Sequence, residues 1–263
     1  MAFLEILVVT ALVAFAGSTM ALARDSGSIS AREILRRTGV RGGLIVHLGC
    51  GDGKLTAGLR ASDSYVVHGL DRDPQNVALA REQIRSLGLY GPVSVDLCDG
   101  KSLPYADNLI NLVVSERRPA IPMAEIMRVL CPNGVAYIKQ GGKWTKRIKP
   151  VPDDIGEWTH YLNGPDNNAV AADRRAGPPR SLRWKSDPMW CRSHNGVSSS
   201  ILLVLSSAGR LFSIVDEGLT GQPGVADLWT LVARDAFNGT LLWKKPLSGR
   251  KSQKSLVAVA DKL

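Results

Sequence analysis

The chain has few cysteines, and none is paired at a spacing that binds a metal. Its 263 residues contain four cysteines, Cys50, Cys98, Cys131 and Cys191, with no C-x-x-C pair. This pattern excludes a disulfide framework and a zinc-ribbon spacing, and no metal site is expected. Small buried thiols are the interpretation that it favours for the first three.

Long apolar runs are absent after the N-terminus. Residues 3–16 form an apolar run interrupted only by Glu5, and Ala21-Leu22-Ala23 follows it. The run is too short to span a membrane comfortably. Its length and the A-x-A site predict a cleaved secretory signal over residues 1–23, and hence export to the periplasm or cell surface. The alternative is a cytoplasmic chain, because no Lys or Arg precedes the run.

Acidic residues are outnumbered by basic ones, and the net charge is +9. The excess is uneven, because residues 1–140 hold 15 Lys and Arg against 13 Asp and Glu, whereas residues 141–263 hold 18 against 11. A basic bias favours anionic surfaces. The basic residues are dispersed and form no nucleic-acid-binding motif, so a solvated surface is the preferred interpretation.

What the chain does contain is an apolar run that ends in closely spaced glycines. Residues 44–48 predict a buried strand, and Gly49, Gly51 and Gly53 follow it at alternate positions. Glycines let the backbone turn sharply and approach a ligand closely. The N–H groups of the helix that follows can then face that ligand.

A second apolar run, residues 65–70, ends at Asp71. An acid in this place can accept hydrogen bonds from ribose hydroxyls, so the two runs together predict a nucleotide site. The dinucleotide fingerprint G-x-G-x-x-G is excluded, because Lys54 occupies its third glycine position.

Strands and helices alternate up to residue 141. Strands are expected at residues 44–48, 65–70, 92–98, 109–114 and 135–138, and helices at 28–38, 54–61, 74–87 and 121–130. This alternation predicts right-handed βαβ units and a parallel sheet of about five strands. No hairpin that would complete the sheet is expected, and residues 142–180 are interpreted as a linker or lead-in.

The second half has a different pattern. Short strands are expected at residues 182–185, 200–206, 210–215, 229–234 and 241–244, with turn residues between them. Strands of this length and spacing predict an antiparallel β segment over residues 181–263.

The glycine spacing resembles motif I of the class I S-adenosylmethionine (SAM)-dependent methyltransferases. Residues 103–107 and 128–134 resemble two later motifs of that family, in the expected order. The resemblance implies a Rossmann-like domain over residues 28–141. It also implies that the three glycines pass under the methionine part of SAM, that Asp71 holds the ribose and that Asp99 lies near the adenine amine.

The full set of SAM-binding candidates is His47, Gly49, Cys50, Gly51, Gly53, Asp71, Arg72, Asp99 and Gly100. Ser115 and Glu116, with Arg117 beside them, are candidates for the side that receives the methyl group. Two positions depart from the family pattern, because His47 and Asn111 stand where the family usually has acids.

Residues 233–243 resemble the "AxDxxTGxxxW" repeat of pyrroloquinoline-quinone (PQQ)-type β-propellers, and residues 255–263 resemble the start of a further blade. A propeller needs several blades, so about one blade implies a piece of a longer protein. PQQ binding is not expected, because no adjacent Cys-Cys pair is present. The order of the segments resembles large exported proteins of planctomycete-type bacteria.

Residues 153–168 are dense in polar and aromatic side chains. Together with Cys191 and His194 they offer an alternative metal or sugar site, although a packed lead-in to the second segment is the favoured interpretation.

The leading hypothesis is a methyltransferase domain that transfers the methyl group of SAM to an unknown acceptor. Two alternatives stay open: an exported non-enzymatic scaffold with a vestigial methyltransferase fold, and a fragment of a quinoprotein oxidoreductase.

Overall fold

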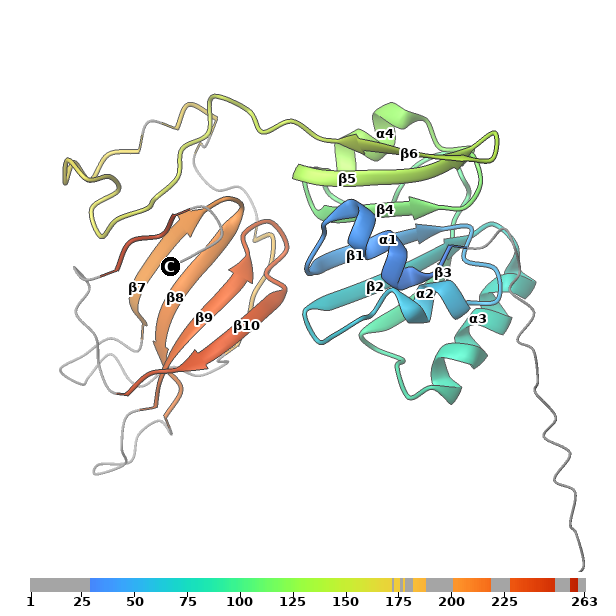
Figure 1. Cartoon of the computed structure of the whole chain (residues 1–263), viewed down its shortest axis with the longest axis horizontal. Helices are drawn as coiled ribbons and strands as arrows, with labels where there is room; N and C mark the ends of the chain where they lie inside the picture. The colour runs from blue at the N-terminus through green and yellow to red at the C-terminus, as the bar shows by residue number, and fades with distance from the viewer. Residues whose placement is uncertain are drawn as a thin grey trace, which may run out of the picture.

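The computed structural model describes residues 29–171, 173–175, 177, 182–187, 201–218, 228–248 and 256–259. The signal predicted for residues 1–23, together with Cys191 and His194, lies outside the described residues. The chain forms two β-sheets, of which the first is covered by helices (Figure 1). No helix in the described part of the chain is long and apolar enough to cross a membrane.

The first sheet has six strands in the order β3-β2-β1-β4-β5-β6. Its strands are β1 (Gly43–Leu48), β2 (Tyr65–Asp71), β3 (Val93–Leu97), β4 (Ile110–Ser115), β5 (Leu130–Gln140) and β6 (Lys143–Ile148). Its helices are α1 (Ala31–Thr38), α2 (Lys54–Gly58), α3 (Pro74–Ser86) and α4 (Met123–Val129). The first five strands are parallel, as the βαβ pattern predicts.

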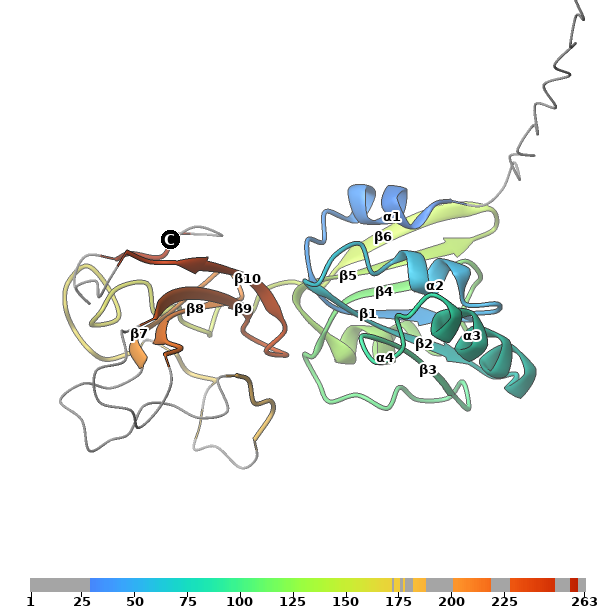
Figure 2. The ribbon, with the colours of Figure 1, turned by 90° about the horizontal axis from the view of Figure 1, so that it is seen from below.

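Both faces of the parallel sheet are buried, which explains why its strands are nearly continuous apolar runs. Ile45 of β1 and Leu112 of β4 are fully buried on the face that carries α1, α2 and α3. Val46 and Val113, the next residues along, are fully buried on the face that carries α4. The two layers of helices are visible in Figure 2.

The sheet does not end at the fifth strand, and here the sequence-based expectation is wrong. β6 pairs antiparallel with β5, from Gln140 opposite Lys143 to Val135 opposite Ile148. Most side chains of β6 are exposed, so no apolar alternation marks it as a strand. Backbone hydrogen bonds hold it in place, and Trp144 stacks on Tyr137 with ring centroids 4.7 Å apart. A sixth strand, rather than a pair of further strands, therefore lies within the stretch interpreted as a linker.

The second sheet has four antiparallel strands in the order β10-β9-β8-β7. They are β7 (Ile201–Ser207), β8 (Arg210–Asp216), β9 (Trp229–Asp235) and β10 (Leu241–Pro246). Residues 182–185 were expected to form a strand, but they are irregular. Four antiparallel strands match the strand number of one propeller blade. That the sheet belongs to a propeller stays a prediction.

The lead-in segment packs along the outer strand of this second sheet. The backbone N–H of Ser206 donates to the carbonyl of Trp158, and the Ser206 hydroxyl accepts from the N–H of Trp158. Ala258 donates its N–H to the carbonyl of Thr159. These bonds use backbone groups that an edge strand otherwise leaves unpaired.

The two sheets meet through Asn111, the second residue of β4. Its side-chain oxygen accepts from the N–H of Leu44 (2.8 Å) and from the amide of Asn238 (2.7 Å). Its own amide donates to the carboxylate of Asp235 at 2.6 Å. Asn238 also donates to the carbonyl of Leu109. The turn between β9 and β10 is thus held against the amino edge of the parallel sheet.

This contact gives a physical reason for asparagine at position 111, where the resemblance led us to expect an acid. A carboxylate there would face Asp235, which is only 6% exposed. Burial already raises the pKa of Asp235, although hydrogen bonds from Asn111, Phe237 and Asn238 oppose that shift. A second carboxylate would add like-charge repulsion and remove a donor.

We therefore expect Asn111→Asp to lower the free energy of unfolding by about 1–3 kcal/mol at neutral pH. In the variant, the new carboxyl group faces Asp235, and the pKa of this pair is raised in the folded state. The variant is therefore most stable at a pH below the ordinary pKa of an acid, where both groups are protonated, and it loses stability as the pH rises. The deficit should consequently shrink as the pH is lowered toward 4. Denaturant unfolding over this pH range measures it, with Asn168→Asp on the exposed lead-in as the control. Equal deficits at every pH would contradict the repulsion.

Candidate functional site

A cavity of about 530 Å³ opens at the carboxyl ends of β1, β2 and β4. Ligands of open α/β sheets bind outside the carboxyl ends of the strands, which is this edge of the sheet. The residues that line it are Leu48, Gly49, Cys50, Gly51, Asp52, Leu55, Leu70, Asp71, Arg72, Asn76, Cys98, Gly100 and Ser115 through Ile121.

The glycine loop adopts the geometry that its sequence requires. Gly49, Gly51 and Gly53 all have positive φ, at 76°, 53° and 79°. A Cβ on Gly53 would lie 2.8 Å from the backbone and side chain of Ala80 in α3, so this glycine also permits the close packing of the loop against that helix. A Cβ on Gly49 or Gly51 would meet no atom within 4 Å, because these two glycines border open space.

Asp71 connects the loop to the end of β2. One carboxylate oxygen accepts from the N–H of Gly51 at 3.0 Å, and the other accepts from the N–H of Asp73 and the amide of Asn76. Burial opposes ionisation of this carboxyl group, but the hydrogen bonds outweigh it and lower its pKa. Asp71 is therefore an ionised acid at neutral pH, and it lines the cavity.

His47 lies behind the loop rather than on the cavity wall. Its side chain is 1% exposed, and its Nδ1 lies 2.8 Å from the hydroxyl of Thr56 in α2. Its Nε2 is buried without a hydrogen-bond partner in the described part of the chain. Burial lowers the pKa of His47 to about 4, so the imidazole is neutral at pH 7.

The structure places three of the other cofactor-binding candidates on the cavity wall and one away from it. Arg72, Cys50 and Gly100 line the cavity. Asp99 does not: it is exposed, and its carboxylate accepts from the N–H of Lys101 at 2.8 Å. Burial raises the pKa of the Cys50 thiol to about 12, so this cysteine is not a nucleophile.

Ser115 and Glu116 both line the opposite wall of the cavity. The Ser115 hydroxyl is buried within hydrogen-bond distance of two carbonyls, Leu48 at 3.1 Å and Arg117 at 2.7 Å. It fixes the turn after β4 and has no free proton to offer a substrate. Glu116 is half-buried, and Arg117 and Arg118 are exposed, so these three are charged groups on this wall that can reach one.

Sequence reasoning missed part of the cavity wall. Asn76 was missed although it lies in the first turn of α3 and donates to Asp71. Arg118 and Ile121 were missed because the segment after β4 is irregular and carries no periodic pattern.

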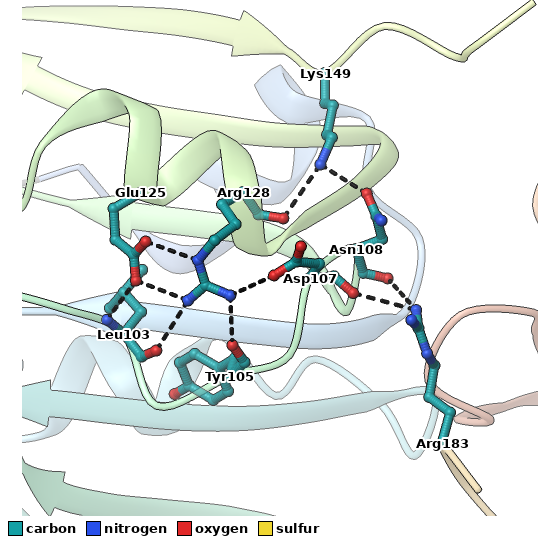
Figure 3. A network of polar contacts seen from close by, with 8 residues as sticks. All are labelled: Leu103, Tyr105, Asp107, Asn108, Glu125, Arg128, Lys149 and Arg183. Carbon is teal, nitrogen blue, oxygen red and sulfur yellow. Dashed lines mark hydrogen bonds and ion pairs between the residues drawn. The ribbon is translucent and has the colours of Figure 1, made fainter. Parts of the chain in front are cut away.

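The two later motifs of the resemblance serve a structural purpose here. Arg128 of α4 donates to the carboxylates of Glu125 and Asp107 and to the carbonyls of Tyr105 and Leu103 (Figure 3). These bonds fix residues 103–107 against the helix. They hold the loop that precedes β4 and lie away from the glycine loop.

Comparisons with known proteins match the part of the chain that contains this cavity. Residues 46–138 match the family model described as "Methyltransferase domain". The match is confined to part of the chain. The match begins inside β1 and ends inside β5, so it includes the glycine loop, Asp71 and the turn after β4.

A curated relative, the methyltransferase GfsG of Streptomyces halstedii, is 32% identical over 117 residues. The alignment covers 42% of this chain and 42% of the relative, so the chain spans less than half the length of the curated relative that it matches.

Solved structures that resemble this chain cover less than half of it. One, described as a putative SAM-dependent methyltransferase of Methanococcus maripaludis, is 26% identical with a TM-score of 0.39 and covers 42% of this chain and 53% of its own. Another, a methyltransferase of Haloferax volcanii in complex with the activator Trm112, is 30% identical with a TM-score of 0.36, covering 41% and 50%.

The buried histidine makes a prediction about pH. The pKa of His47 is near 6.5 in an unfolded chain and about 4 in the folded one, so the unfolded state binds the proton more readily between these values. The contribution of His47 to stability should fall as the pH falls from 6.5 to 4, by up to about 1.4 kcal/mol per pH unit.

Denaturant unfolding of the wild type and of His47→Gln measures this effect, because the other titrating groups cancel in the difference. The stability of the wild type should decline more steeply with acid than that of the variant. Parallel curves would contradict a neutral buried imidazole.

Proposed function

We propose that the methyltransferase domain binds SAM in the 530 Å³ cavity and transfers its methyl group to a substrate that enters beside Glu116. The observation that carries this proposal is the ionised carboxylate of Asp71, which lines the cavity while accepting from the N–H of Gly51. It places a hydrogen-bond acceptor next to a glycine loop that approaches a ligand without side chains.

The residues fit the cofactor on structural grounds. Gly49 and Gly51 border open space and have positive φ, so the loop is a cradle that side chains would obstruct. Each carboxylate oxygen of Asp71 can accept more than one hydrogen bond. The groups that already contact Asp71 therefore leave capacity for ribose hydroxyls.

SAM supplies an electrophilic methyl group, and the task of the chain is to hold donor and acceptor in line. The Ser115 hydroxyl fixes the turn that forms the acceptor wall, through its contacts with Leu48 and Arg117. Glu116 is the carboxylate of that wall and can accept a proton or a hydrogen bond from the substrate. Loss of alignment rather than loss of a base is the expected consequence of changing this turn.

Of the two departures from the family pattern, only that at His47 bears on the cofactor, and it does not remove the cradle. The neutral His47 gives no charge for the methionine ammonium group, and Asn111 is used at the other edge of the sheet. We also propose that the chain is exported and that it belongs to a longer parent protein with further propeller blades. The methyl acceptor is unassigned. The alternative of a non-enzymatic scaffold is an outcome of the test below.

We expect the full chain to bind S-adenosylhomocysteine, and Asp71→Asn to weaken that binding by about 1–3 kcal/mol because polar partners are left unpaired. Isothermal titration calorimetry measures both affinities. Asp99→Asn is the matched control, since it changes an acid that the structure places off the cavity wall.

Each result has a definite meaning. The site is supported if binding is saturable and if Asp71→Asn weakens it more than Asp99→Asn. No binding of S-adenosylhomocysteine at millimolar concentration would leave the scaffold as the better explanation. A larger loss with Asp99→Asn than with Asp71→Asn would move the nucleotide away from Asp71.

A further inference from the structure

A second, smaller cavity of about 300 Å³ lies at the opposite edge of the parallel sheet, and we call it the basic cleft. It forms where the amino end of β4 and the end of β6 meet the lead-in and the second sheet. The residues that line it are Asp107, Asn108, Arg128, Pro132, Lys149, Pro152, Ile155, Arg175, Arg183 and Phe237. Four of these are cationic and one is anionic.

Two of the cations converge on a single residue, Asn108 (Figure 3). The ammonium group of Lys149 donates to the Asn108 side-chain oxygen at 2.7 Å. The guanidinium of Arg183 donates to the Asn108 carbonyl at 3.4 Å and to the Asp107 carbonyl at 3.2 Å. Lys149 follows β6, whereas Arg183 belongs to the irregular segment before the second sheet. Segments distant in the sequence therefore bring these charges together.

The charges of the cleft are only partly balanced. Arg128 pairs with Asp107 and Glu125, and Arg175 pairs with Asp154. Within the described ranges, no carboxylate lies at ion-pair distance from Lys149 or Arg183, whose hydrogen bonds all go to uncharged oxygens. Neither of these two charges is therefore balanced by an ion pair in the described residues, although the Asp107 carboxylate attracts Lys149 from a longer distance.

Both groups retain donors for a ligand. The ammonium of Lys149 has three protons and donates to two oxygens, Asn108 Oδ1 and the Arg128 carbonyl. Among the residues that the structure describes, Arg183 donates through Nη1 alone, so its Nε–H and Nη2–H groups have no partner there. Burial lowers the pKa of Lys149, the direction expected for an ammonium group that lacks a full counter-charge.

The remaining wall is apolar. Pro132, Pro152, Ile155 and Phe237 face the same cavity. A ligand that fits this surface carries a doubly negative head group on a small apolar body.

We propose that the basic cleft binds a phosphate monoester, with Lys149 and Arg183 as its anion-binding groups. A phosphate monoester carries nearly two negative charges above its second pKa of about 6. Its oxygens accept several charge-assisted hydrogen bonds at once. The cleft lies at the amino edge of the sheet and the glycine loop at the carboxyl edge, so this site is separate from the proposed SAM cavity.

Phenyl phosphate is the probe, titrated into the full chain at about pH 7.5 in low chloride and followed by ³¹P NMR. We expect saturable binding, with benzoate and benzyl alcohol much weaker because they carry one charge and none. Lys149→Met keeps the aliphatic stem and should weaken binding by about tenfold or more, the loss expected for a hydrogen bond to a charged group.

Arg183→Gln is the second variant, because Lys149 also bonds the carbonyl of Arg128 and its loss affects the fold. Arg183 is exposed and contacts backbone carbonyls alone, so Arg183→Gln should fold normally and weaken binding to a similar extent. Lys143→Met, at the exposed start of β6, removes the same charge away from the cleft and should change the affinity less than twofold.

Three results would overturn the proposal. The first is no saturable binding of phenyl phosphate at 10 mM. The second is an equal loss of affinity in Lys143→Met, which would indicate a general charge effect. The third is benzoate binding as tightly as phenyl phosphate, which would exclude a site built for a dianion. Asp71→Asn should bind the probe as the wild type does, so failure of the SAM proposal leaves this test intact.

Discussion

The architecture of the candidate SAM site depends on a few hydrogen bonds that join the ends of β1 and β2. The N–H groups of Gly49 and Cys50 donate to the carbonyl of Leu70, and the N–H of Gly51 donates to the carboxylate of Asp71. Because these bonds tie the loop to the neighbouring strand, the glycines cannot relax away from the cavity. The acid that we assign to ribose therefore also shapes the loop, and the two roles are inseparable.

The two edges of the parallel sheet are used for different purposes. The carboxyl edge carries the cavity with the glycine loop, as expected for an open α/β sheet. The amino edge holds the second sheet through Asn111, Asp235 and Asn238, and it carries the basic cleft beside that contact. Asn111 has no role at the cofactor cavity, so its departure from an acid says nothing about methyl transfer. It belongs to the packing of the two sheets.

Sequence reasoning succeeded where a pattern is local and failed where the contact is distant. The five parallel strands and their helices follow from apolar runs, caps and glycines, each readable within a few residues. β6 was missed because its stability comes from pairing with β5 and from the Trp144 stack, whereas its own side chains are exposed. Within the site, Gly51 and Asp71 were predicted from spacing. The exposure of Asp99 and the burial of His47 depend on how α2 and the loop pack, which no spacing reveals.

At position 47 the chain has a neutral histidine, where the family that it resembles usually has an acid. A buried carboxylate without a paired cation costs more to desolvate than a neutral imidazole does. The imidazole keeps a hydrogen bond to Thr56 and leaves one nitrogen without a partner, a cost of about 1–3 kcal/mol. The acids that line the cavity are Asp52, Asp71 and Glu116. Asp52 is paired with Lys54, so in the proposal Asp71 and Glu116 are the acids that can attract a cationic cofactor.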